Sequence, residues 1–252
     1  MIYVMSDLHG EYEKYKAMLD KIELRDEDTL FVLGDVIDRG NQGIRILLDM
    51  MNRENVCPIS GNHEYMASCC FGWLKNGITQ ENMNNLKDEQ VQDLADWMAN
   101  GAYPTIRELT LLSRDEQDAV FEYVLNFSLY EVVYVNQQKY ILVHAGLGNF
   151  NPLKELSDYT IDELVWQRPK LEKRLFDDLE TFVVCGHTPT PLICGEAKIY
   201  HYHQQIFIDC GASFQGGKLG CLCLDTMEEY YIDWWKIRFY FFLYRLIRWT
   251  ML

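Results

Sequence analysis

Short apolar runs alternate with segments of helical hydrophobic periodicity in the N-terminal part of the chain. Three runs, at 2–5, 29–33 and 56–60, have the length and composition of buried strands. Between them, apolar residues recur at helical spacing over about 11–22 and again over 44–51, which predicts two amphipathic helices. Strands that alternate with helices in this way are typical of an α/β fold with a largely parallel sheet.

Polar residues follow each of these predicted strands. Because binding sites in parallel α/β sheets form beyond the carboxyl ends of the strands, we expect these polar residues to lie together. Pro58 lies within the third strand and cannot donate to a neighbouring strand, so it predicts an edge or irregular position there.

The middle of the chain changes in character. Residues 73–128 are polar, with helical periodicity around 91–98 and 119–124, but they hold too few apolar residues for a core of their own. We therefore predict a helical insertion within a single domain. From residue 129 onward strand-like runs return, and they suggest the antiparallel pairing of a β-meander, so we expect mixed sheets.

Composition and charge narrow the class of protein. Apolar residues make up 48% and charged residues 24% of the 252 residues, which excludes a disordered or fibrous chain. The 23 basic and 38 acidic residues give a net charge of −15, which argues against general nucleic-acid binding. The eight cysteines form no CxxC pair, and the first residues lack a signal-peptide pattern, so we expect reduced thiols and a cytoplasmic location.

The last twenty residues, 233–252, are aromatic and basic, with four basic residues against one acidic residue. Charges interrupt this segment too often for a transmembrane helix. An interfacial helix at an anionic membrane, a strand that continues the core and a segment that docks on another protein all remain open. The catalytic chemistry is expected within residues 1–232.

Five polar clusters hold side chains that can bind metals. They are Asp7-Leu8-His9-Gly10, the segment from Gly34 to Gly40, Gly61-Asn62-His63-Glu64, His144-Ala145-Gly146 and Gly186-His187-Thr188-Pro189. Each cluster alone is a weak signal, since a single histidine is more often an ordinary hydrogen-bonded residue. Together they contain four of the six histidines, with the Asp and Asn oxygens that suit manganese, iron or zinc. Their joint occurrence indicates a metal centre.

The set D-x-H, G-D-x-x-D-R-G, G-N-H-E, H-A-G and G-H resembles the phosphoprotein phosphatase family of binuclear metallophosphoesterases. The short bacterial and phage serine/threonine phosphatases of that family are the most similar. The motifs span residues 7–187, and the general pattern continues to about 232. One departure is Ser6, where the family usually has glycine. The resemblance implies an α/β fold in which a mixed β-sandwich is flanked by helices.

The resemblance also implies a site for two divalent metal ions, with manganese favoured over iron or zinc. Asp35 would bridge the two ions. The other implied ligands are Asp7 and His9 for the first ion, and Asn62, His144 and His187 for the second.

Four further residues receive roles from the resemblance. His63 would be the general acid, oriented by Asp38, and Arg39 would bind the phosphate. Arg168, which follows a tryptophan in V-W-Q-R-P, is the best match for a second phosphate-binding arginine. The positive charge of two metals and two arginines would reverse, locally, the repulsion between an acidic chain and an anionic substrate.

The reaction implied is dephosphorylation of phosphoserine or phosphothreonine in proteins, by in-line attack of a hydroxide that bridges the metals. The partner expected is thus a phosphorylated protein or a small phosphoester. Hydrolysis of a dinucleoside polyphosphate such as diadenosine tetraphosphate is the main alternative, and a phosphatase for RNA or nucleotide ends is another. A binding module with an inactive site is disfavoured, because every ligand position is filled.

Overall fold

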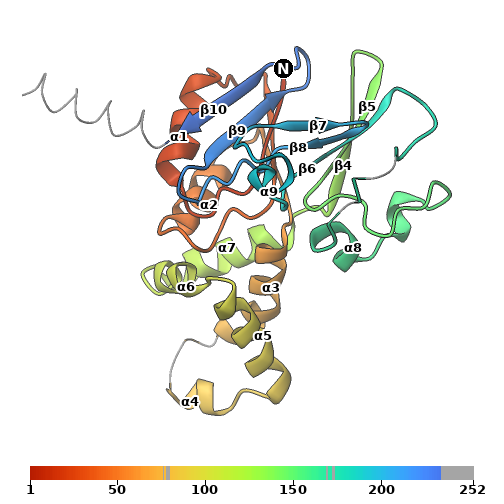
Figure 1. Ribbon diagram of the computed structural model, residues 1–252. Helices are drawn as coiled ribbons and strands as arrows, with labels where there is room; N and C mark the ends of the chain where they lie inside the picture. The colour runs from red at the N-terminus through yellow and green to blue at the C-terminus, as the bar shows by residue number, and fades with distance from the viewer. Residues whose placement is uncertain (76, 78–79, 169, 172–173, 234–252) are drawn as a thin grey trace, which may run out of the picture.

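The computed structural model describes residues 1–75, 77, 80–168, 170–171 and 174–233 (Figure 1). Its strands form two five-stranded sheets, in the orders β10-β9-β1-β2-β3 and β4-β5-β6-β8-β7. The first sheet contains β1 (Ile2–Met5), β2 (Thr29–Leu33), β3 (Val56–Ile59), β9 (Lys218–Cys223) and β10 (Glu229–Asp233). The second contains β4 (Tyr130–Val135), β5 (Gln138–Val143), β6 (Thr181–Cys185), β7 (Tyr200–Tyr202) and β8 (Gln205–Phe207).

The first sheet is parallel on one side and antiparallel on the other. β1 pairs in parallel with β2, and β2 in parallel with β3. β9 pairs antiparallel to β1, and β10 antiparallel to β9. β3 lies at the edge of the sheet, which confirms the position that Pro58 predicted.

The second sheet confirms mixed pairing but shows that the meander prediction was wrong in part. β4 and β5 form an antiparallel hairpin, and β7 pairs antiparallel to β8. β5, β6 and β8, however, run parallel to one another. The reason is chain length between strands: α8 (Ile161–Val165) and α9 (Thr190–Cys194) lie in connections long enough for parallel crossovers.

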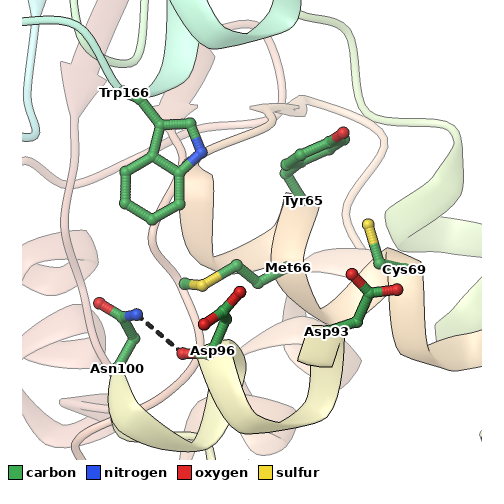
Figure 2. Close-up of a pocket in the computed structure, with 7 residues that line it drawn as sticks. All are labelled: Tyr65, Met66, Cys69, Asp93, Asp96, Asn100 and Trp166. Atoms are coloured by element: carbon green, nitrogen blue, oxygen red, sulfur yellow. Dashed lines mark hydrogen bonds between the residues drawn. The ribbon is translucent and has the colours of Figure 1, made fainter. Parts of the chain in front are cut away.

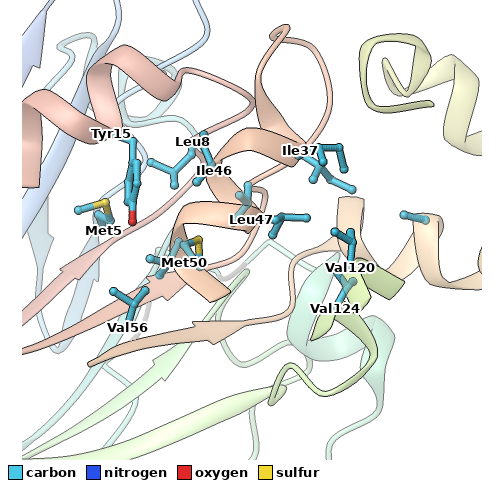
Figure 3. Packing of buried hydrophobic residues seen from close by; sticks show 14 of the residues in the cluster. Met5, Leu8, Tyr15, Ile37, Ile46, Leu47, Met50, Val56, Val120 and Val124 are labelled. Carbon is cyan, nitrogen blue, oxygen red and sulfur yellow. The ribbon is translucent and has the colours of Figure 1, made fainter. Parts of the chain in front are cut away.

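The two sheets pack face to face, because alternate residues of each strand point to opposite sides. Val4 and Leu33 of the first sheet share a buried cluster with Leu142 and Val184 of the second. This is the predicted mixed β-sandwich. On the outer face of the first sheet, Met5 packs instead toward helices α1 (Tyr12–Lys21) and α2 (Gly43–Met51), whose buried residues fill the space in Figure 3.

Five helices lie together at one end of the sandwich (Figure 1). They are α3 (Asn62–Leu74), α4 (Gln80–Asn84), α5 (Asp88–Ala99), α6 (Tyr103–Leu109) and α7 (Arg114–Leu125). Phe71 and Phe121 stack with their ring centroids 4.3 Å apart, and Val120 joins the same cluster as Leu47 of α2. The insertion therefore packs on the core that covers the first sheet.

The predicted apolar stripe of residues 91–98 differs in detail from the structure. Val91 and Met98 of α5 are exposed, whereas Trp97 is completely buried. The indole forms a hydrogen bond with Asp38, described below, and this contact decides which face of α5 turns inward.

The remaining expectations concern the thiols and the C-terminus. All eight cysteines are free thiols. Among the described residues, no helix has both the length and the apolar character needed to span a membrane. Asp233 ends β10, and the rest of the aromatic and basic segment, 234–252, lies outside the described residues.

Candidate metal centre

The loops after five strands meet at one end of the sandwich, and they carry the predicted metal ligands. The backbone N–H of His9 donates to the Asp35 carbonyl over 2.8 Å, so the loops after β1 and β2 are tied together. Similarly, the Gly186 N–H donates to the His144 carbonyl over 2.8 Å, which ties the loops after β5 and β6. Of the six predicted ligands, five are buried and His187 is half-buried.

Several of these residues have left-handed backbone conformations. The φ angles of Asp7 and Asp35 are both 53°, that of His9 is 42° and that of His187 is 60°. Residues other than glycine rarely adopt positive φ, and such conformations gather at functional sites. Here the sharp turns direct the side chains away from the sheet and toward one another.

Asp35 lies at the centre of the site, and its two carboxylate oxygens face different histidines. Oδ2 lies 3.5 Å from Nε2 of His9, whereas Oδ1 lies 3.4 Å from Nε2 of His144. Two groups have ligand atoms that all lie within 4.8 Å of one another: His9, Asp35 and His63 form one, and Asp35, His144 and His187 form the other. Asp35 belongs to both, as a carboxylate that bridges two ions must.

Asp7 lies beside these two groups and belongs to neither. Its Oδ1 and Oδ2 accept hydrogen bonds from the backbone N–H of His187, over 3.2 and 3.0 Å. Gly186 makes this approach possible, because a Cβ atom at that position would lie only 2.1 Å from Oδ2 of Asp7. The structure thus brings Asp7 to the edge of the centre, with its carboxylate turned to the backbone after β6.

Two of the histidines are oriented by backbone carbonyls. Nδ1 of His9 lies 3.0 Å from the Ile37 oxygen, and Nδ1 of His144 lies 2.7 Å from the Leu33 oxygen. A neutral imidazole that donates through Nδ1 presents a lone pair at Nε2, the state that binds a metal. Nε2 of His144 also lies 3.0 Å from the Asn62 side-chain oxygen, which is itself an acceptor. Two acceptors that face each other in this way fit a shared cation.

The pKa shifts of the buried side chains also fit a site for cations. Burial raises the pKa of the Asp7 and Asp35 carboxyls well above the usual range, and the nearby Asp209 charge raises that of Asp7 further. Burial lowers the pKa of His9 and His144 well below the usual range. Buried carboxylates without enough counter-charge are costly unless they bind cations. Neutral imidazoles and buried carboxylates are therefore a donor set that fits divalent metal ions.

The His63 ring is oriented by a carboxylate, although it also lies 4.7 Å from the His9 ring. Its Nδ1 lies 2.6 Å from Oδ2 of Asp38, and both side chains are completely buried. Its Nε2 lies 3.1 Å from Nη2 of Arg39. Because Nδ1 is hydrogen-bonded to Asp38, only Nε2 faces the centre, where it lies beside the Arg39 guanidinium.

Arg168 is the least constrained of the predicted residues. It is exposed, and it lies near enough to the centre for its charge to act on two groups there. Burial, with the Arg168 charge as the next cause, lowers the pKa of His187 to about 4. Burial raises the pKa of Asp209 to about 6, against the opposing effects of its bond to Gly211 and of the positive charges of Arg39 and Arg168.

Sequence reasoning assigned no direct role to Glu64, a member of the G-N-H-E cluster, and missed Asp209. The buried Glu64 carboxylate accepts backbone N–H groups of Asp35 and Val36 over 2.7 and 2.8 Å, and of Gly61 over 3.0 Å. It thus fixes the turn that carries Asp35. Asp209 is also buried, beyond β8. A sequence signal for Asp209 was present, since this aspartate follows an apolar run, as Asp35 does.

Two residues of the insertion were missed as well. Trp97 donates from Nε1 to Oδ2 of Asp38 over 2.8 Å, and Thr105 donates from Oγ1 to Oδ1 over 2.6 Å. They lie 59 and 67 residues from Asp38 along the chain. No local pattern could have found them.

A pocket of about 410 Å³ adjoins the centre (Figure 2). Tyr65, Met66 and Cys69 of α3 line it, together with Asp93, Asp96 and Asn100 of α5 and its end, and Trp166 after α8. The Trp166 ring lies 6.3 Å from that of His187, so one indole borders both spaces. The Asp93 carboxylate makes no ion pair or hydrogen bond with the described residues, so this wall carries an unneutralised negative charge.

Comparison with known families supports the chemistry of the centre. Residues 1–217 match the sequence profile of the calcineurin-like phosphoesterases. Serine/threonine-protein phosphatase 2 of Escherichia coli is 25% identical over 85% of this chain and 89% of its own length. The protein of the same name from Salmonella typhimurium is 28% identical over 86% and 90%. A symmetrical bis(5'-nucleosyl)-tetraphosphatase of Hamiltonella defensa is 29% identical, over 38% of this chain and 36% of its own.

Solved structures show the same fold at low sequence identity. A candidate diadenosine tetraphosphatase superimposes with a TM-score of 0.62 at 14% identity, over 92% of both chains. A metallophosphoesterase from Sphaerobacter thermophilus gives a TM-score of 0.52 at 13% identity, over 92% of this chain and 88% of its own. The two-sheet sandwich with flanking helices is therefore shared with both.

Proposed function

Because the chain belongs to the calcineurin-like phosphoesterase family, and is thus a metal-dependent phosphoesterase, we propose that it removes phosphate from phosphoserine and phosphothreonine in proteins. One observation carries the choice of substrate. The two relatives named serine/threonine-protein phosphatase 2 match along 85–86% of this chain. The tetraphosphatase from Hamiltonella defensa matches over 99 residues only.

The proposed centre holds two divalent cations, with manganese favoured over iron or zinc. We assign the first to Asp7 and His9, the second to Asn62, His144 and His187, and the bridge to Asp35. When bound, the two cations neutralise phosphoryl oxygens and lower the pKa of a coordinated water. The support for this assignment is the way the Asp35 oxygens divide between His9 and His144.

The chain's own side chains would serve the remaining parts of the substrate. Arg39 and His63 lie side by side, with 3.1 Å between Nη2 and Nε2. A guanidinium forms paired hydrogen bonds with phosphoryl oxygens, and the adjacent imidazole is then placed to give a proton to the leaving oxygen. Arg168 would add positive charge from the exposed side of the centre.

The pocket beside the centre also favours a peptide over a polyphosphate. Its wall combines two aromatic rings, of Tyr65 and Trp166, with the carboxylates of Asp93 and Asp96. Aromatic rings and carboxylates suit the side chains that flank a phosphorylated residue, whereas carboxylates repel additional phosphate groups. Hydrolysis of a dinucleoside tetraphosphate is the second candidate, because several tetraphosphatases match part of this chain.

A substrate panel with manganese tests the proposal. We expect phosphoserine and phosphothreonine peptides to be hydrolysed with a kcat/KM at least about tenfold above that of diadenosine tetraphosphate or 5'-phosphorylated RNA. Asp35→Asn protein prepared in parallel shows whether the activity belongs to this chain. A preference for the dinucleotide would overturn the protein-phosphatase assignment, and activity that survives chelation would overturn the metal mechanism.

A further inference from the structure

The helical insertion reaches into the catalytic centre through two buried side chains. Trp97 of α5 and Thr105 of α6 are 0% and 1% exposed, and both donate to the carboxylate of Asp38. Thr105 bonds in both directions, because its Oγ1 also accepts the backbone N–H of Asp38 over 2.9 Å. One threonine thus fixes the backbone and the side chain of the same aspartate.

We propose that Trp97 and Thr105 are positioning residues for proton donation: they act through Asp38 to hold the His63 ring in line with the leaving oxygen. This inference rests on the proposed function, since it needs an ester whose leaving group takes up a proton. It assigns the helical insertion a part in the chemistry as well as in packing.

The loop that carries Asp38 needs such support. Asp38 and Arg39 have φ angles of 70° and 63°, conformations that side-chain-bearing residues rarely adopt unless their surroundings hold them there. The insertion supplies the restraint, since the Arg39 N–H also donates to the Gly101 carbonyl over 3.0 Å, between α5 and α6. The same short segment therefore holds both the aspartate and the phosphate-binding arginine.

The contrast with the other histidines shows why this restraint matters. His9 and His144 are oriented by the carbonyls of Ile37 and Leu33, which cannot rotate. His63 is oriented by a carboxylate, which can. With Trp97 and His63 on Oδ2 and Thr105 on Oδ1, all rotation of that carboxylate breaks a hydrogen bond. The direction of the His63 ring is thereby fixed as firmly as by a backbone contact.

The dependence of kcat on the leaving group of the ester tests this positioning role. Residues that only stabilise the fold would lower kcat equally for all esters. Phenyl phosphate releases a basic phenolate that needs a proton, whereas dinitrophenyl phosphate releases a weak base that does not. We expect Trp97→Phe and Thr105→Val to lower kcat about 10- to 100-fold for phenyl phosphate and less than about threefold for dinitrophenyl phosphate. KM and the metal bound per chain should stay unchanged, and Thr105→Ser should restore kcat.

Trp73→Phe is the matched control. Trp73 is also buried near the insertion, on α3, but its Nε1 has no hydrogen-bond partner among the described residues. Its replacement should leave both esters unaffected. A double variant adds a second readout. In an Asp38→Asn background, Trp97→Phe should lower kcat for phenyl phosphate by less than about twofold, because the carboxylate through which Trp97 acts is already absent.

The outcomes separate this inference from the proposed function. Equal losses on both esters, full additivity with Asp38→Asn, or failure of Thr105→Ser to restore activity would overturn the positioning role. If Trp97→Phe fails to fold, the comparison of Thr105→Val with Thr105→Ser decides the question. Wild-type protein that hydrolyses dinitrophenyl phosphate but no phosphopeptide would overturn the proposed substrate and leave the positioning role standing.

Discussion

The histidines that face Asp35 and the histidine that faces Asp38 are held by different parts of the fold. His9 and His144 donate to backbone carbonyls of the first sheet: Leu33 ends strand β2, and Ile37 lies in the loop that follows it. Asp38, the partner of His63, is held by side chains of α5 and α6, two helices of the insertion. The proposed metal side of the centre thus depends on the sandwich, and the proposed proton-donating side depends on the insertion.

This difference means that the two sides can be disturbed separately. A change at the strand ends should alter metal binding and activity together. A change in the insertion should alter proton donation and leave the metals in place. The following substitutions test that division, from the largest expected effect to the smallest.

Asp35→Asn removes the group on which both sides converge. We expect kcat/KM for p-nitrophenyl phosphate to fall by about 10³-fold or more, because a bridging carboxylate charge is lost from a two-metal site. Metal analysis after dialysis should show less than the full metal content. Asp26→Asn, a change at an exposed carboxylate, is the control. Activity within about tenfold of wild type would contradict the central place of Asp35.

Gly186→Ala disturbs only the metal side. The new Cβ would lie 2.1 Å from Oδ2 of Asp7, so the carboxylate must move. We expect about a 10²-fold loss of activity at low manganese, measured as a weaker metal affinity by calorimetric titration. Gly72→Ala on α3 is the matched control, since its Cβ meets nothing within 4 Å. Unchanged metal affinity in the Gly186 variant would place Asp7 outside the metal site.

Glu64→Gln tests how strongly the turn after β2 depends on one buried carboxylate. The Glu64 carboxylate accepts several backbone N–H groups. In the Glu64→Gln variant, the side-chain NH2 group would face some of these N–H groups, and two donors cannot form a hydrogen bond. We expect the free energy of unfolding to fall by about 2–3 kcal/mol, measured by urea denaturation. Glu54→Gln, at an exposed position, is the comparison. A stability within about 0.5 kcal/mol of wild type would show that the turn is held by other contacts.

Asp49→Asn should have the smallest effect and should spare both sides of the centre. Burial raises the pKa of Asp49, but hydrogen bonds from Arg53, Tyr15 and Lys16 outweigh it, so the pKa lies below the usual value. A carboxyl with a lowered folded-state pKa stabilises the protein above its unfolded-state pKa, and this stability is lost as the pH falls through the folded-state value.

The wild type should therefore exceed Asp49→Asn in unfolding free energy by about 0.5–1 kcal/mol near neutral pH. The difference should shrink below about pH 4, near the ordinary pKa of aspartate. Urea titrations at several pH values measure this, and kcat should not change. A difference that grows as the pH falls would contradict the sign derived from the hydrogen bonds.

The meeting of the strand-end side chains could be predicted from the sequence, because its signals are local. An apolar run that ends in Asp, Asn or His marks both a strand and the ligand beyond it, as at Asp7 and Asp35. Parallel strands then bring such ends together without further information. The β-sandwich as a whole followed from the family resemblance that these motifs carry.

The proton-donating side could not be predicted in the same way. Trp97 and Thr105 look like ordinary helix residues, and their importance comes from contacts with a residue far away in the chain. The prediction of strand pairing was wrong in part for a related reason. Hydrophobic alternation does not encode strand direction, so the segments of β5, β6 and β8 could be read as an antiparallel meander. Only the crossovers through α8 and α9 decide it.

The position of β1 has a consequence for biosynthesis. This strand lies in the middle of its sheet, between β2 and β9, and Met5 pairs with Cys221, which is synthesised long after it. One edge of β1 stays open until β9 has been synthesised, and His187 also emerges long after Asp7. A nascent chain would therefore carry an unprotected sheet edge, a site for aggregation, and could not assemble all the proposed metal ligands before His187 had emerged.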